Sequence, residues 1–209
     1  MKSRVGNALA VGLTVACLIG SSFSSGLGNP NVASPTTIEA MIKVQKDSSA
    51  KLFLRMAEVI ESPRCLNCHP AGRSPTQGDD MHLHTPPIVS DASGHGIPGL
   101  HCSACHSVSN EPIHMPNIQV VPGNPAWALA PAAFAWQHRS LREICEQIKD
   151  PRRNGGRTLE KIHDHVAYDP LVGWAWHPGL GRKPAPMTQA TFGRLVQRWI
   201  DSGAKCPAA

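Results

Sequence analysis

Two short stretches of the sequence repeat one arrangement of cysteine and histidine. They read CLNCH at residues 65–69 and CSACH at residues 102–106, and they share only the two cysteines and the histidine. C-x-x-C-H is typical of c-type haem attachment, in which the two thiols add to the vinyl groups of the porphyrin and the adjacent imidazole binds the iron. The sequence therefore predicts two covalently bound haem c groups, attached through Cys65, Cys68, Cys102 and Cys105, with His69 and His106 as the proximal iron ligands.

Two other chemistries use paired cysteines. A zinc ribbon separates its C-x-x-C pairs by about 15–20 residues, whereas 33 residues lie between Cys68 and Cys102. A four-cysteine zinc site would also have no use for the two histidines that follow the pairs. A redox dithiol would have to occur twice, and no thioredoxin-like pattern accompanies either copy. Haem attachment is the interpretation that uses all the motif residues.

The ligand on the opposite face of each iron decides between an electron carrier and a catalyst, because His or Met closes the site and a missing ligand opens it. Among the other histidines, His84 precedes two prolines, His114 lies beside a proline in IHMP, and His165 falls on a short predicted helix. We expect two of these three to be distal ligands, and the sequence does not assign them to one iron or the other. Thioether alternatives are Met81, Met115 and Met187.

The first 26 residues form a predicted signal peptide. Lys2 and Arg4 give it a basic start, and the apolar run that ends at Gly20 is too short to span a bilayer comfortably. A retained anchor and a lipid-modified Cys17 are the alternatives, and the residues before Cys17 fit a lipidation site poorly. We expect an exported periplasmic protein without a membrane span after cleavage, consisting of a single domain over residues 27–209.

Export to an oxidising compartment would favour a disulfide between cysteines outside the two motifs. Cys145 and Cys206 remain once the four haem cysteines and Cys17 are set aside. An oxidising compartment favours disulfides. The sequence therefore predicts that these two cysteines form one disulfide.

Composition limits the kind of fold. The chain has 19 prolines and 18 glycines among 209 residues, and residues 70–101 and 107–138 show no sustained periodicity. Such a chain has difficulty building a sufficient apolar core unless disulfides or a large cofactor add stability. Helix is predicted over residues 35–61 in two pieces with Ser34 as N-cap, and over residues 140–149, 158–167 and 188–202. Apolar stripes mark the first and last helices, at Leu52, Met56, Val59 and Ile60 and at Phe192, Leu195, Val196 and Trp199. The expected fold class is mainly α with a high proportion of irregular loop, like a dihaem cytochrome c, with no substantial β-sheet.

Charge and aromatic residues give weaker indications. Without Lys2 and Arg4, 18 basic residues face 15 acidic ones, a surplus that four haem propionates would cancel. No nucleic-acid partner is indicated. Trp127 and Trp136 could pack on porphyrin or in an ordinary core. Five basic residues beside glycines could pair with propionates, with an acidic partner or only with water: Arg152, Arg153, Arg157, Arg182 and Lys183.

Longer stretches around the motifs resemble a family of bacterial dihaem c-type cytochromes, of the kind labelled as subunits associated with isoquinoline 1-oxidoreductase, a molybdenum hydroxylase. The likeness covers about residues 60–207 and includes ICEQIKDPRRNGG and DPLVGWAWHPGLGR. It implies electron transfer for a partner dehydrogenase and no substrate site in this chain. One departure is Ala128, which stands where the family pattern has His between Trp and Leu. The matching positions are Cys65, Cys68, His69, His84, Cys102, Cys105, His106, His114 and His165.

The residues and the resemblance together predict a periplasmic dihaem cytochrome that carries single electrons for a redox protein partner, either a dehydrogenase or another cytochrome. The alternative is a haem enzyme with one open or labile sixth position, acting on peroxide or on a small sulfur or nitrogen compound with nearby histidines as acid or base. A haem-based sensor is less favoured, because no signalling domain is recognised. The carrier is preferred over the catalyst, and no catalytic residue is assigned.

Overall fold

A computed structural model describes residues 34–115 and 118–208, without the side chains of residues 43–47, 114 and 115. The predicted signal peptide and Cys17 lie outside the described residues. Among the residues that are described, no helix is both long and apolar enough to cross a membrane.

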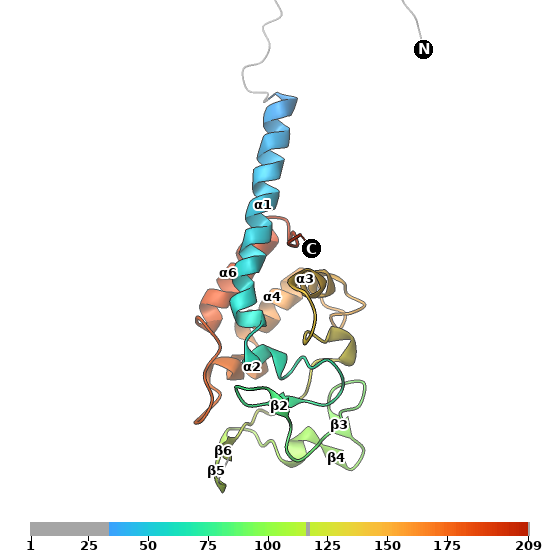
Figure 1. Cartoon of the computed structure of the whole chain (residues 1–209), viewed down its shortest axis with the longest axis vertical. Helices are drawn as coiled ribbons and strands as arrows, with labels where there is room; N and C mark the ends of the chain where they lie inside the picture. The colour runs from blue at the N-terminus through green and yellow to red at the C-terminus, as the bar shows by residue number, and fades with distance from the viewer. Residues whose placement is uncertain (1–33, 116–117, 209) are drawn as a thin grey trace, which may run out of the picture.

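The first helix, α1 (Pro35–Ile60), begins where the sequence indicated. Ser34 is its N-cap, and its Oγ accepts a hydrogen bond from the backbone N–H of Thr37 at 3.3 Å. Pro35 occupies the first turn, where its missing N–H leaves no bond unmade. The predicted division of this helix into two pieces is wrong, because no proline or glycine follows Pro35 within it. The N-terminal end of α1 projects beyond the rest of the described chain (Figure 1).

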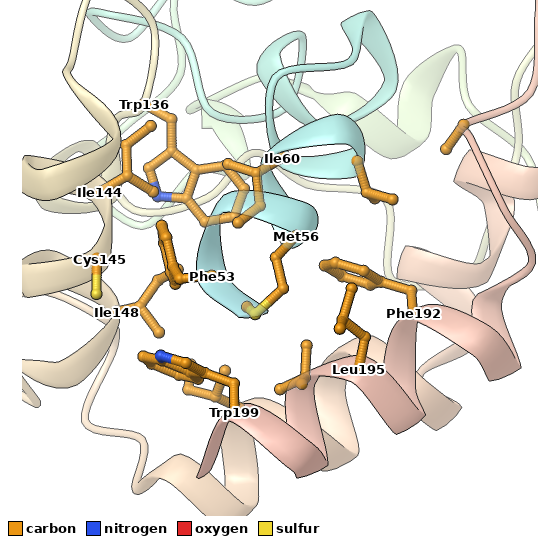
Figure 2. Packing of buried hydrophobic residues seen from close by; sticks show 14 of the residues in the cluster. Phe53, Met56, Ile60, Trp136, Ile144, Cys145, Ile148, Phe192, Leu195 and Trp199 are labelled. Carbon is orange, nitrogen blue, oxygen red and sulfur yellow. The ribbon is translucent and has the colours of Figure 1, made fainter. Parts of the chain in front are cut away.

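The hydrophobic core lies among the C-terminal half of α1 and three later helices, α3 (Leu141–Lys149), α4 (Leu159–Tyr168) and α6 (Gln189–Asp201). Helix α6 packs against both α1 and α4, and its predicted apolar stripe is buried. Phe53 and Trp199 meet in this core with ring centroids 5.4 Å apart (Figure 2). Cys65 and Leu66 pack against its edge, so the first C-x-x-C-H motif is anchored to the helical core.

Each of the three later helices begins with a side-chain cap. Ser140 and Glu143 form a capping box at the start of α3, and Thr158 and Thr188 cap α4 and α6 through side-chain oxygens. These contacts satisfy backbone N–H groups that a helix start leaves without partners.

The predicted disulfide is confirmed. Cys145 of α3 is bonded to Cys206, which follows α6, and their Cα atoms are 5.6 Å apart. The bond closes a loop that contains both α4 and α6, and it therefore ties α3 to the segment that follows α6.

The loops that were expected to be irregular contain three small antiparallel hairpins. Two of them have strands of only two residues, and such segments are too short to show a periodicity in sequence. The second hairpin depends on Gly96, whose φ is +96° and where an added Cβ would lie 2.6 Å from the carbonyl oxygen of Leu100. The strands are β1 (Thr76–Gln77), β2 (His82–Leu83), β3 (Gly96–Ile97), β4 (Leu100–His101), β5 (Glu111–Met115) and β6 (Ile118–Val121).

The fold is consequently a mixture of helices, hairpins and loops rather than mainly helical, and the described residues contain no substantial sheet, as predicted. The hairpins occupy the end of the molecule opposite the free end of α1 (Figure 1). Short helical turns complete the chain: α2 (Pro63–Leu66), η1 (Cys102–Ala104), η2 (Ala132–Phe134), α5 (Pro170–Gly173) and η3 (Trp174–Trp176).

Candidate functional site

Both C-x-x-C-H motifs fold into the same backbone turn. In the first, which continues α2, the backbone N–H groups of Cys68 and His69 donate to the carbonyl of Cys65 at 3.2 and 3.1 Å. In the second, which includes η1, the N–H groups of Cys105 and His106 donate to the carbonyl of Cys102 at 3.2 and 3.0 Å. A single helical turn therefore groups two cysteines and a histidine twice, although the two motifs share no other residue.

The four motif cysteines are free thiols, in contrast to Cys145 and Cys206. Burial raises the pKa of Cys65 to about 12 and that of Cys68 to about 11. Burial also raises the pKa of Cys102, whereas Cys105 is exposed. At neutral pH Cys65, Cys68 and Cys102 are therefore uncharged thiols.

His69 is held in one orientation by the chain segment that follows the third hairpin. Its Nδ1 donates to the carbonyl oxygen of Phe134 at 2.7 Å, and its ring stacks on Trp136 with centroids 3.7 Å apart. Burial lowers the pKa of His69 to about 4, although the bond to Phe134 opposes the change. The ring is therefore neutral, and because a carbonyl can only accept, the proton lies on Nδ1 and Nε2 keeps its lone pair.

His106 is held in the same manner. Its Nδ1 donates to the carbonyl oxygen of Pro122 at 2.6 Å, and its ring stacks on Trp127 with centroids 4.7 Å apart. Burial lowers its pKa as well. Ligating histidines usually donate their second ring nitrogen to a carbonyl or carboxylate, which fixes the tautomer that binds metal.

His84, a predicted distal ligand, lies opposite His106. The ring centroids are 6.0 Å apart, and the Nδ1 of His84 donates to the carbonyl oxygen of Pro86 at 2.8 Å. Imidazole nitrogens bind a transition metal such as zinc at about 2.0–2.1 Å, so rings on two sides of one ion have centroids about 6 Å apart. The spacing and the free Nε2 atoms fit a shared metal ion.

His165, another predicted distal ligand, lies on α4 in the neighbourhood of His69. Its Nδ1 donates to Oδ2 of Asp169 at 2.8 Å, one turn further along the chain. It lies near enough to His69 to contribute to the lowered pKa of that ring, after the effect of burial. A shallow hollow beside His165 is lined by Arg157, Lys161 and Asp169, among others, but His69 does not border it.

The third distal candidate, His114, lies in β5, and its side chain is outside the described residues, so that prediction stays open. His82 is unsuited to the role because both ring nitrogens are engaged, by Asp80 at 2.6 Å and by Gln77 at 3.1 Å. His101 borders the same cavity as His84, but its contact to the carbonyl of His95 is longer, at 3.3 Å.

A cavity of about 420 Å³ surrounds the second motif, within the size range of cofactor sites. Cys102, Cys105, His106 and His84 all border it. Its other walls are largely apolar, and include Ile88, Leu100, Ile113, Ile118, Val121, Trp127, Leu129 and Trp174. The donor set and the apolar surroundings fit a haem attached at Cys102 and Cys105.

The two tryptophans weighed in the sequence have different settings. Trp136 is buried in the helical core and Trp127 borders the cavity, yet each stacks on the histidine of one motif. Ala128, at the position that departs from the family pattern, also borders the cavity. Arg64 is a residue that the sequence did not single out. It directly precedes Cys65, is only 3% exposed, and borders the cavity of the second motif.

Comparisons of the chain with family models, with curated proteins and with solved structures gave no match. The resemblance to dihaem cytochromes therefore remains a prediction. In the described part of the chain no three or more His, Cys, Asp or Glu side chains gather as a metal site. A haem iron takes only one or two ligands from the protein, so pairs of histidines are the arrangement that such a cofactor requires.

Proposed function

We propose that this protein is a periplasmic dihaem c-type cytochrome that carries single electrons. The observation that carries the proposal is the common state of four histidines: each donates its Nδ1 proton to a fixed acceptor. Each motif histidine has one distal candidate near it: the ring of His84 lies 6.0 Å from that of His106, and His165 is near enough to His69 to lower its pKa.

Each pair leaves two Nε2 lone pairs for one iron. The haem, when attached, supplies an iron that alternates between the ferric and ferrous states. His69 and His106 would bind it next to the attachment cysteines, while His84 and His165 would occupy the opposite faces. Closure of both faces disfavours substrate binding at iron and favours a carrier over the enzymatic alternative.

The two proposed centres adjoin one another. Cys68, from the first motif, borders the cavity of the second motif. A haem attached at Cys68 would therefore begin at the wall of the space that holds the other haem. This arrangement supports transfer of an electron between the two within one chain.

The second centre would exchange electrons with the partner, a dehydrogenase or another cytochrome. Cys105 is the exposed member of the four motif cysteines, whereas His69 of the first motif stacks on the core residue Trp136 and meets the core residue Phe134 edge-on. The Cys145–Cys206 disulfide agrees with an oxidising compartment such as the periplasm.

The test is expression of the full chain in a bacterium that performs c-type haem attachment, followed by measurement of haem per chain. We expect two haems in the wild type and one in each of the double variants C65A/C68A and C102A/C105A. The matched control is C145A/C206A, which removes two cysteines and should retain both haems. A wild-type protein without covalent haem would refute the proposal.

Optical and EPR spectra then decide between carrier and enzyme. Low-spin irons that do not bind carbon monoxide are expected of the carrier. A high-spin component that binds carbon monoxide would show an open position and favour the enzymatic alternative.

A further inference from the structure

The guanidinium of Arg64 is buried, and only some of its N–H groups donate hydrogen bonds. Its Nη2 donates to the carbonyl of Gly78 and to Oδ1 of Asp79, both at 2.8 Å. Its Nε and Nη1 are buried and find no hydrogen-bond partner among the described residues. Leaving buried donors of a charged group unpaired is costly, so such donors usually indicate a missing acceptor.

A second guanidinium borders the same cavity. Arg182 donates from Nη2 to the carbonyl of Val120 at 2.9 Å and from Nη1 to that of Pro178 at 3.4 Å. Burial lowers the pKa of Arg182, and the neighbouring positive charge of Arg64 lowers it further. The two cations are therefore close enough to repel one another.

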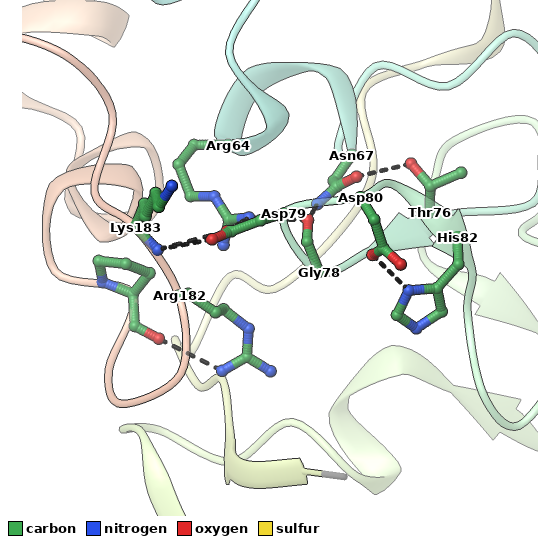
Figure 3. A network of polar contacts seen from close by, with 10 residues as sticks. Arg64, Asn67, Thr76, Gly78, Asp79, Asp80, His82, Arg182 and Lys183 are labelled. Atoms are coloured by element: carbon green, nitrogen blue, oxygen red, sulfur yellow. Dashed lines mark hydrogen bonds and ion pairs between the residues drawn. The ribbon is translucent and has the colours of Figure 1, made fainter.

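The negative charge near these cations is insufficient to balance them. Among the described residues that border the cavity, none is Asp or Glu. Asp79 pairs with Arg64 from outside the lining, and its oxygens also accept the backbone N–H of Lys183 at 3.3 Å (Figure 3). Two arginines with one carboxylate leave an excess of positive charge at an apolar cavity, where charge is weakly screened.

We propose that Arg64 and Arg182 form a carboxylate-binding site for a propionate of the haem attached at Cys102 and Cys105. This inference rests on the proposed function. A guanidinium matches a carboxylate in shape and can bind both of its oxygens. The site lies on the wall of a cavity that is also bordered by the two thiols and the imidazole of the second motif and by His84, so the carboxylate would come from the molecule that fills the cavity.

The pairing has a consequence for the reduction potential of that haem. Positive charge near the iron disfavours the ferric state, which carries one more positive charge than the ferrous state. Arg64 and Arg182 would therefore raise the potential of the second haem. Because Arg64 is the residue before Cys65, the backbone that holds the first haem would also hold the charge that tunes the second.

The experiment compares R64Q and R182Q with the wild type, each as the full haem-loaded chain, by redox titration followed optically. R152Q is the matched control, since Arg152 also pairs with an aspartate, Asp150, but its side chain is 91% exposed. The C102A/C105A variant identifies which transition belongs to the second haem.

We expect two haems per chain in every arginine variant. In R64Q and R182Q the reduced-to-oxidised ratio of the second haem at a fixed potential should fall about tenfold, which is about 59 mV for a one-electron couple. R152Q should leave both transitions unchanged. R64K should lower the reduced-to-oxidised ratio less than R64Q does, because lysine keeps the positive charge but lacks the planar guanidinium that can bind both carboxylate oxygens.

Unchanged titrations in R64Q and R182Q, with two haems attached, would overturn the carboxylate site and leave the cytochrome proposal standing. A wild type without haem would overturn both. If R64Q does not fold, the redox titration of R182Q alone decides whether the carboxylate site exists. Inorganic phosphate tests for a free anion: a shift of the wild-type transition by phosphate that R182Q abolishes would mean that the site takes anions from solution, which overturns the propionate assignment.

Discussion

The disulfide gives the prediction whose magnitude follows most directly from the structure. Cys145 and Cys206 are 61 positions apart in sequence, and a cross-link that closes a loop of this length stabilises the folded state by about 4 kcal/mol in the chain-entropy treatment. The double variant C145A/C206A should therefore lose about 4 kcal/mol in its free energy of unfolding. For a chain of this size the corresponding fall in Tm is roughly 10 °C.

Urea denaturation of the haem-loaded protein, with and without a strong reductant, measures this effect. The reductant should lower the unfolding free energy of the wild type to that of C145A/C206A and leave the variant unchanged, because thioether links to haem are not disulfides. Haem content should stay at two per chain throughout. A variant within about 1 kcal/mol of the wild type, or a reduced wild type of unaltered stability, would refute the reasoning that this bond constrains the unfolded chain.

Three further predictions concern single side chains. H84A should open the second haem alone to carbon monoxide, and a spectrum with no carbon monoxide adduct would remove His84 as ligand. D169N replaces the carboxylate that accepts the Nδ1 proton of His165. Because this makes the His165 imidazole a less basic ligand, the reduction potential of the first haem should rise. An unchanged or lower potential would contradict the assignment of His165 to the first haem. T158A removes the cap of α4 and should cost about 1 kcal/mol of stability with both potentials unchanged, while T158S retains the cap; equal stability of the two variants would show that the cap contributes nothing.

The helices were predictable because their signals are local. Ser140 with Glu143, and Thr158 and Thr188, mark starts that the structure confirms within a residue. The apolar stripe of α6 follows the helical repeat and is buried. The core residue Phe53 was not singled out, although it stands three residues before Met56 and seven before Ile60 on the same helical face, and it is fully buried against Trp199.

The hairpins were not predictable by the same means. Their strands are mostly two residues long, and their pairing depends on glycines with positive φ, such as Gly96 in β3 and Gly99 in the turn that follows it. Their role is visible only in three dimensions. The β1–β2 loop carries Asp79 to Arg64, and the segment after β2 carries His84 to His106.

The candidate site shows the same division between local and long-range information. The motif residues could be named from spacing alone, but the groups that orient their imidazoles could not. His69 donates to the carbonyl of Phe134, 65 positions away, and His106 to that of Pro122, 16 positions away. Every residue has a backbone carbonyl, so side-chain identity does not reveal these acceptors. Of the four acceptors only Asp169, four residues after His165, could have been read from the sequence as a helical neighbour. Under the proposed function, the distal ligands are therefore expected among histidines whose Nδ1 proton is already donated to a fixed acceptor, because this tautomer leaves the Nε2 lone pair free to bind iron.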